Sequence, residues 1–191
     1  MSDPVAYNFY GTTVPVLKSI SNSAISTLRA AKDEQSKGGL PSDQEVLDST
    51  FGDMLPFRVQ PVILVKFGVA ALEYLKLTKA DSPTLDPGFK SLDEVITFFE
   101  SYVKVLDSID EKEYNAAADK GCDVSIGPGK PTLHMTGLAD YFHTFVVPNS
   151  YFHLNAMYML LRSKGFKLGK GQYIGSFMSE QQQKDWAPLR G

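Results

Sequence analysis

Four stretches of the sequence carry apolar residues at the three- and four-residue spacing that is typical of one face of an α-helix. The first stretch runs from about Thr13 to Glu34. Pro15 is compatible with this helix because it falls in the first turn. Residues 36–45, "SKGGLPSDQE", contain two glycines and a proline and predict a flexible loop. The inner face of the first helix is predicted to consist of Leu17, Ile20, Ala24, Leu28 and Ala31.

The second stretch, "VQPVILVKFGVAALEYL", is apolar nearly all round, which indicates a helix enclosed in a bundle. Asp53 is expected to cap this helix, and Pro56 lies in its first turn. Pro61 would then lie deep enough to remove a backbone hydrogen bond. We therefore expect a kink near Phe57.

The third helix opens with "SLDE", in which Ser91 and Glu94 have the spacing of a capping box. It closes with the charged run "DSIDEKEYN", which predicts a solvated helix end. Its inner stripe is predicted to consist of Leu92, Val95, Ile96, Phe99, Val103 and Leu106.

Two short β-like runs in "CDVSIGPGKPTLHM" flank residues 127–129, Gly-Pro-Gly, and predict a small hairpin packed as a flap on the helices. The fourth helix starts near Thr136 and ends before Gly165, which suits the left-handed position after a helix. Pro148 lies inside it and should weaken the helix near Thr144. Residues 176–191 are expected to form an extended tail, poorly ordered unless Trp186 docks.

The pattern as a whole predicts an all-α protein, a four-helix bundle with a small β-hairpin before the last helix. We expect a single domain over residues 1–191, with a core of about 13–175. The net charge of −3 gives no support for nucleic-acid or anionic-membrane binding. A single cysteine, Cys122, excludes an internal disulfide and indicates a reducing, cytoplasmic location. No apolar run reaches a membrane span, and no secretory signal is recognised.

The candidate chemistry lies on the fourth helix, where Asn149 and His153 are four residues apart on an apolar face. A buried polar group without a partner costs ~1–3 kcal/mol, so each side chain needs one. One interpretation is a satisfied core pair that meets Gln60 or a tyrosine. The other is that both residues line a pocket, together with aromatic side chains of the same helix.

The other two histidines and the cysteine point less clearly to chemistry. His143 is ten residues from His153, an offset of roughly 80° on a straight helix, so the two do not form a metal-binding pair. His134 lies in the predicted hairpin and is expected at the surface. Cys122 has no base near it in the sequence that would activate a thiol.

The segment "DYFHTFVVPNSYFHLNAMYMLLRSKGFKLGKGQYIG" resembles the C-terminal signature of an uncharacterised family in the DinB/YfiT-like superfamily, whose members are regarded as metalloenzymes. "DMLPFRVQPVILVKFGVAA" resembles the second helix of the same family, and "SLDEVITFFESYVKVLDSID" resembles its third. The resemblance extends from about Thr13 to Gly175. It implies the four-helix bundle and, in many members, a homodimer.

The superfamily's usual site contains three histidines, one from the second helix and two from the last, that bind a divalent ion such as nickel or zinc. The resemblance places Phe67 at the first position and Asn149 and His153 at the other two. A phenyl ring cannot bind a metal, and a neutral amide is a weak ligand for these ions. We therefore expect neither the family metal nor another cofactor.

These observations lead to two main hypotheses. In the first, the protein is a metal-independent enzyme that performs acid–base chemistry on a small aromatic or carbonyl compound. His153 would move the proton, and Asn149 or Tyr158 would hold an oxygen. In the second, it is a non-catalytic small-molecule binder or a dimeric scaffold. The pocket in either case is predicted to include Phe67, Gln60, Phe142, His143, Phe145 and Phe152.

A third hypothesis keeps a metal. A bend at Pro148 would bring His143 and His153 together, and a carboxylate would join them. A pocket that is open at His153 would favour chemistry or binding, whereas a sealed Asn149–His153 pair would favour a structural role.

Overall fold

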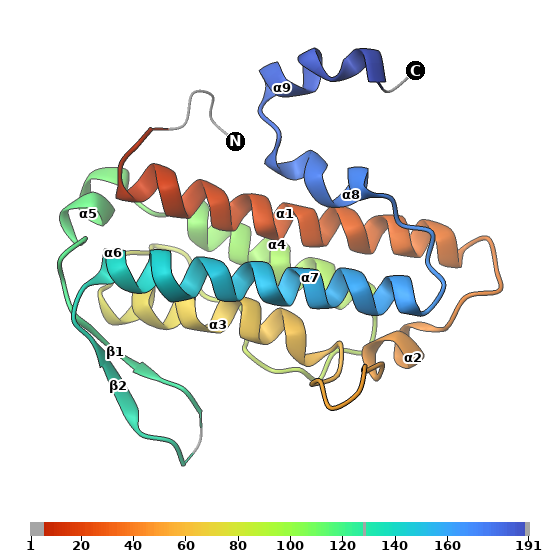
Figure 1. Ribbon diagram of the computed structural model, residues 1–191. Coiled ribbons are helices and arrows are strands. Elements are labelled where there is room, and N and C mark those ends of the chain that lie inside the picture. The colour runs from red at the N-terminus through yellow and green to blue at the C-terminus, as the bar shows by residue number, and fades with distance from the viewer. Residues whose placement is uncertain (1–5, 128, 190–191) are drawn as a thin grey trace.

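The computed structural model describes residues 6–127 and 129–189, which form a bundle of four long helices with a hairpin at one end (Figure 1). The all-α bundle predicted from the apolar pattern is confirmed. The long helices are α1 (Phe9–Gln35), α3 (Val59–Tyr74), α4 (Leu92–Asp107) and α7 (Val147–Ser163). The shorter elements are α2 (Asp43–Leu47), α5 (Glu111–Ala116), β1 (Cys122–Ser125), β2 (Thr132–Met135), α6 (Leu138–Tyr141), α8 (Lys170–Ile174) and α9 (Glu180–Asp185).

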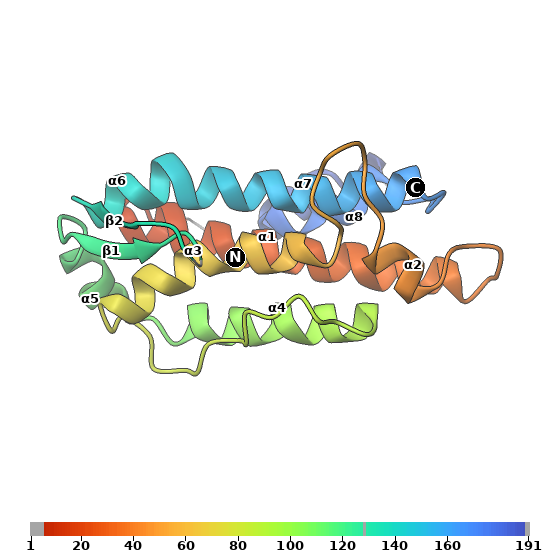
Figure 2. The ribbon, with the colours of Figure 1, turned by 90° about the horizontal axis from the view of Figure 1, so that it is seen from below.

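Helices α1 and α7 run in the same direction, opposite to α3 and α4. Lys18 near the start of α1 pairs with Asp107 at the end of α4, and Lys32 near the end of α1 pairs with Asp93. Figure 2 shows α4 and α7 on opposite sides of the bundle, with α1 and α3 between them. The connection 75–91 therefore returns along the bundle, so that α3 and α4 can be parallel.

The predicted inner faces of α1 and α4 lie in the core. All five positions named for α1 are buried, which confirms that stripe. On α4, Val103 is only half-buried, while Tyr102 and Val105 are buried. The buried stripe of α4 thus includes Tyr102 and Val105 in place of Val103.

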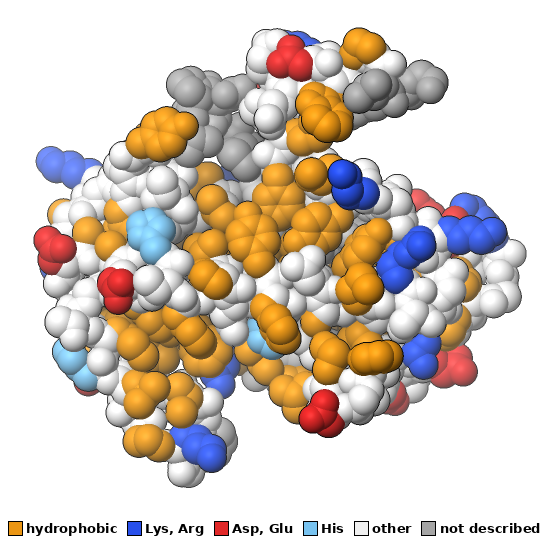
Figure 3. Space-filling view, viewed as in Figure 1, with side chains coloured by type: hydrophobic (Ala, Val, Ile, Leu, Met, Phe, Trp, Pro, Cys, Tyr) orange, Lys and Arg blue, Asp and Glu red, His pale blue; other side chains and the backbone are white. Residues whose placement is uncertain are grey.

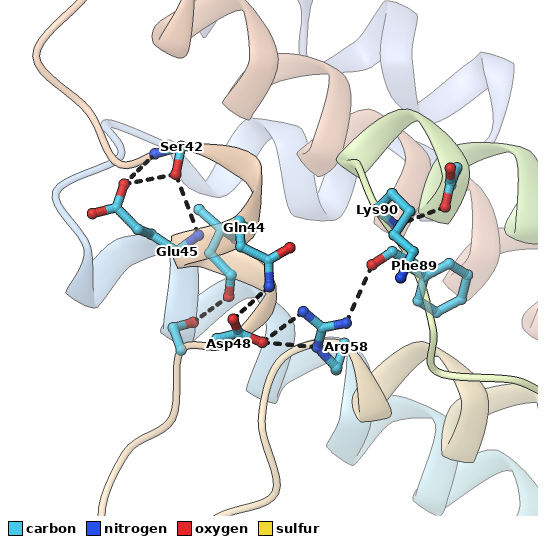
Figure 4. A network of polar contacts seen from close by, with 10 residues as sticks. Ser42, Gln44, Glu45, Asp48, Arg58, Phe89 and Lys90 are labelled. Atoms are coloured by element: carbon cyan, nitrogen blue, oxygen red, sulfur yellow. Dashed lines mark hydrogen bonds and ion pairs between the residues drawn. The ribbon is translucent and has the colours of Figure 1, made fainter.

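Helix α3 begins at Val59, so the predicted cap at Asp53 and the predicted kink near Phe57 are wrong. Pro61 lies in the first turn, where its missing N–H costs nothing because those N–H groups have no partner within the helix. Arg58 precedes the helix. Its guanidinium contacts the Asp48 carboxylate at 2.6 and 2.9 Å and donates to the Phe89 carbonyl at 3.2 Å, which ties α2, α3 and the start of α4 together (Figure 4).

Two short helices lie where the sequence indicates a loop and a solvated end. Helix α2 starts with a capping box between Ser42 and Glu45, a spacing already present in "SDQE". Helix α5 buries Tyr114, whose ring stacks on Phe9 with centroids 4.3 Å apart. The capping box predicted for α4 is only half formed, because Glu94 accepts from the N–H of Lys90 instead of the N–H of Ser91.

The predicted hairpin is confirmed, with β1 antiparallel to β2 and Cys122 opposite Met135. Cys122 and Val124 are buried, so this side of β1 faces the helices. Pro128 of the predicted turn lies outside the described residues.

The last helix of the bundle is interrupted close to the predicted weak point at Thr144. A π-helical turn spans Phe142–Val146, and Val147 donates to the carbonyl of Phe142, five residues back. Pro148 follows at the start of α7, where it needs no N–H. At the other end, Gly165 has a φ of 94° and Phe166 donates to Leu161, which confirms the predicted helix stop.

The chain after α7 folds back along α1, and within the segment predicted to be an extended tail residues 180–185 form α9 (Figure 1). The Ser23 hydroxyl donates to the carbonyl of Tyr173 at 2.7 Å, which fixes α8 on α1. Trp186 keeps 51% of its surface exposed. None of the described helices has both the length and the apolar character that crossing a membrane requires.

Gly68 lets α3 approach α4 closely, because a Cβ there would lie 2.9 Å from the Tyr102 hydroxyl oxygen. That hydroxyl is buried and has no hydrogen-bond partner among the described residues. We expect Gly68→Ala to lower the free energy of unfolding in urea by ~1–3 kcal/mol. In a Tyr102→Phe background the loss should disappear or turn into a gain of up to ~1 kcal/mol, because alanine favours a helix over glycine. An equal loss in both backgrounds would contradict this close contact.

Candidate functional site

His153 of α7 is buried, with 7% of its surface exposed, and its Nδ1 lies 2.7 Å from the Oε1 of Gln60 on α3. The amide nitrogen of Gln60 donates to the Leu55 carbonyl at 2.7 Å, so the amide oxygen faces the imidazole. Nδ1 therefore carries the proton and donates it to Gln60. Nε2 keeps a lone pair and has no partner among the described residues.

Burial lowers the pKa of His153 to about 4, because the apolar surroundings disfavour the charged imidazolium. The imidazole is thus neutral at pH 7. A base with such a low pKa accepts a proton only weakly near neutrality.

Asn149 and Ser150 extend the same contact along α3. The Asn149 amide nitrogen donates to the Ile63 carbonyl at 3.2 Å, and the Ser150 hydroxyl lies 3.0 Å from the Leu64 carbonyl. Asn149 and His153 therefore do not pair with each other, and each pairs with α3. We call this set the α3–α7 polar contact; it consists of Gln60, Asn149, Ser150, His153 and the carbonyls of Ile63 and Leu64.

Phe67 is not the α3 residue that meets His153. It follows Gln60 by two helical turns, about 10 Å along the axis. Its ring packs edge-on against Phe145, with centroids 5.0 Å apart. Sequence alone could not fix this register, because the second helix contains no histidine to anchor the comparison.

The remaining predicted site residues lie elsewhere. The Nε2 of His143 contacts the Thr12 hydroxyl at 2.9 Å, so this ring faces α1 and is not brought to His153. Phe142 is buried in the core, and Phe152 is 61% exposed. The Tyr158 hydroxyl donates to the Leu168 carbonyl at 2.8 Å, which gives it a structural partner. The predicted pocket thus divides into separate places, and the third hypothesis, which pairs His143 with His153, is wrong.

A cavity of about 400 Å³ lies between the hairpin and the start of the last helix. On the face shown in Figure 3, hydrophobic side chains gather between the hairpin and the helices. We call the cavity between the hairpin and the last helix the Phe67 cavity. It is lined by Phe67, Val124, Ile126, Leu133, His134, Met135, Thr136, Gly137, Asp140, Tyr141, Thr144 and Phe145.

Three aromatic rings form one wall of this cavity. Phe145 stacks on Tyr141 with centroids 5.8 Å apart and an angle of 11°, and it meets Phe67 edge-on. The Tyr141 hydroxyl is buried and has no partner among the described residues, and burial raises its pKa. Of the predicted pocket residues, only Phe67 and Phe145 line the cavity. The lining residues of the hairpin were not predicted, because their place depends on how the hairpin packs on the helices.

Comparison with known proteins gives the family. The model of the domain of unknown function DUF1993 matches residues 9–174. The chain belongs to the DUF1993 family. The crystal structure of a DinB family member protein from Shewanella denitrificans is similar with a TM-score of 0.68 and 24% identity, over 87% of this chain and 91% of that one. That likeness shows the fold, and the expected DinB-like bundle is confirmed. No curated protein matches the chain.

The three-histidine site implied by the DinB/YfiT resemblance does not fit this DUF1993 chain. The polar contact contains one imidazole, whose Nδ1 is bonded to Gln60, and the amide nitrogen of Asn149 is bonded to Ile63. Among residues 6–127 and 129–189, no group of three or more His, Cys, Asp or Glu side chains is placed to hold a metal ion. Amides and a phenyl ring do not replace imidazoles as ligands of zinc or nickel.

The buried state of His153 makes a prediction about pH. Its folded-state pKa of about 4 lies below the usual 6.5, so the unfolded chain takes up the proton first as the pH falls. The contribution of the neutral His153 imidazole to the free energy of unfolding is complete above pH ~6.5 and is lost as the pH falls toward ~4. We expect wild type to lose about 2 kcal/mol more than His153→Gln between pH 7 and pH 4.5 in urea unfolding. Glutamine at position 153 can still donate to Gln60 but takes up no proton. If the free energy of unfolding fell equally with pH in wild type and in His153→Gln, the burial of the imidazole would be contradicted.

Proposed function

We propose that this DUF1993 protein is a DinB-like binder of a small, largely apolar molecule, and that the Phe67 cavity is its binding site. The cavity itself carries the proposal, because a volume of about 400 Å³ with three aromatic rings along one wall is within the range of small-molecule sites. The apolar hairpin residues and the few polar groups at the edge have the composition that such sites usually have.

We further propose that the superfamily's metal position is degenerate here and serves as a helix–helix contact. His153 and Asn149 each bond to α3, and the Ser150 hydroxyl lies between the Leu64 carbonyl of α3 and the Val146 carbonyl, so this region joins two helices without an ion. The same observations favour binding over the acid–base hypothesis. A general base should have a pKa near the working pH and reach its substrate, whereas His153 is buried with a lowered pKa.

The dimeric scaffold stays a second candidate because of one surface feature. Phe152 and Met159 are exposed at seven-residue spacing along α7, where they could meet a second copy. The homodimer stays a prediction, as do the cytoplasmic location and the lack of nucleic-acid and membrane partners.

Binding of the neutral aromatic 2-naphthol, followed by its fluorescence, tests the proposal. We expect saturable binding of one molecule per chain. Thr144→Trp places a large side chain at the cavity wall and should weaken binding at least tenfold. Thr97→Trp, at an exposed position of α4, is the matched control and should bind as wild type does.

Absence of saturable binding would contradict the proposed site. Equal binding by wild type and both tryptophan variants would place the probe elsewhere and would also contradict it. The fold of each variant can be checked by circular dichroism, so that a loss of binding is not confused with unfolding.

A further inference from the structure

Two polar side chains at the edge of the Phe67 cavity, Asp140 and Thr144, offer hydrogen-bond acceptors. The Asp140 carboxylate has no partner among the described residues. The Thr144 hydroxyl donates its proton to the Asp140 backbone carbonyl at 2.7 Å, so its oxygen is left to accept. The His134 Nδ1 donates to the Asp123 carboxylate at 2.7 Å, and both side chains lie on the face of the hairpin opposite to the buried Cys122 and Val124, so this imidazole supplies no acceptor to the cavity.

Two backbone donors near the cavity are already in use. Helix α6 begins beside it, and the free N–H groups of a helix start would ordinarily attract an anion. Here Leu138 donates to the Lys120 carbonyl at 2.9 Å and Ala139 donates to the Ala118 carbonyl at 2.8 Å. An anionic group near α6 would therefore meet the Asp140 carboxylate and would find these two helix-start donors occupied.

One cation lies next to the lining, and it limits where a positive ligand could sit. Lys66 donates to the Ile126 carbonyl at 2.9 Å, and its Nζ lies 5.0 Å from the centroid of the Phe67 ring. The ring of Phe67 thus already interacts with a positive charge. Among the described residues, no cation lies over the rings of the Tyr141–Phe145 stack. Asp140 directly precedes Tyr141 in the sequence, and Thr144 directly precedes Phe145.

We propose that the ligand of the Phe67 cavity is an organic cation, an aromatic or alkyl ammonium compound whose charge lies between the Asp140 carboxylate and the Tyr141–Phe145 stack. The aromatic faces attract the positive charge, and the carboxylate neutralises it. The apolar part of the ligand extends toward Phe67 and the hairpin residues Val124 and Leu133. This inference rests on the proposed binding function and specifies its ligand class.

A charged and a neutral probe of the same shape test the inference. Phenyltrimethylammonium and tert-butylbenzene differ in one atom and in the charge. Both are measured by displacement of bound 2-naphthol at constant ionic strength. We expect the cation to bind about tenfold more tightly than the neutral isostere, because a partly exposed cation–π contact and a surface ion pair together are of that size.

Two substitutions should move this preference in opposite directions. Asp140→Asn should remove most of it and leave the affinity for tert-butylbenzene unchanged. Lys66→Gln should strengthen it by removing a repulsive charge. Asp119→Asn is the matched control, since it removes the same charge at an exposed position outside the lining and should leave the preference unchanged.

The outcomes separate the two proposals. If 2-naphthol binds but the cation has no advantage, or if Asp140→Asn keeps the advantage, the organic-cation inference is overturned and the binding function stands. If 2-naphthol itself does not bind, the binding function fails first. A larger effect of Asp119→Asn than of Asp140→Asn would overturn the placement of the charge.

Discussion

The hydrogen bond between His153 and Gln60 sets how the last helix meets α3, and the candidate site depends on it. An imidazole buried to this extent must be neutral and must have a partner, because an unpaired polar group costs ~1–3 kcal/mol. Gln60 satisfies the ring with its oxygen and the Leu55 carbonyl with its nitrogen. Because Gln60 makes both hydrogen bonds, it fixes the register of α7 on the antiparallel helix α3. Two turns further along α3, this register brings Phe67 against Phe145.

The π-helical turn explains why one helix can serve two sites. A π turn accommodates one extra residue, which rotates the residues before it relative to those after it by about 100°. Before and within the turn, Asp140, Tyr141, Thr144 and Phe145 line the cavity under the hairpin. After the turn, Asn149, Ser150 and His153 face α3. His143 faces α1 instead, which keeps it away from His153.

The sequence predicts the bundle well because its signals are local and strong. Each of these signals depends on a few neighbouring residues: the three- and four-residue spacing in α1, Gly165 after the end of α7, and the two β-like runs. The start of α3 was missed because Asp53 and Pro56 suit a helix start, whereas the N–H groups of Phe57 and Arg58 donate to the carbonyls of Ser49 and Leu47 before the helix begins. The capping box of α2 was readable in "SDQE" but lay in a stretch with two glycines and a proline.

The candidate site was less predictable because it depends on contacts between distant segments. Residues 60 and 153 share no local pattern, and the sequence could only offer Gln60 as one of several partners for His153. The cavity forms because the hairpin packs beside α6. The spacing of Val124, Leu133 and His134 in the sequence does not specify the distance between the hairpin and α6. The resemblance supplied three site positions, whereas the bonds of His153 and Asn149 to α3 depend on how two segments distant in the sequence meet.

The most direct test of this account is a long-range proton–nitrogen NMR spectrum of the His153 imidazole at neutral pH, recorded before and after one equivalent of zinc. The account predicts a neutral ring with the proton on Nδ1, a lone pair on Nε2 and nitrogen shifts that zinc leaves unchanged. A ring that carries its proton on Nε2, or an Nε2 resonance that moves on stoichiometric binding of zinc, would contradict the claim that this position joins two helices in place of holding a metal.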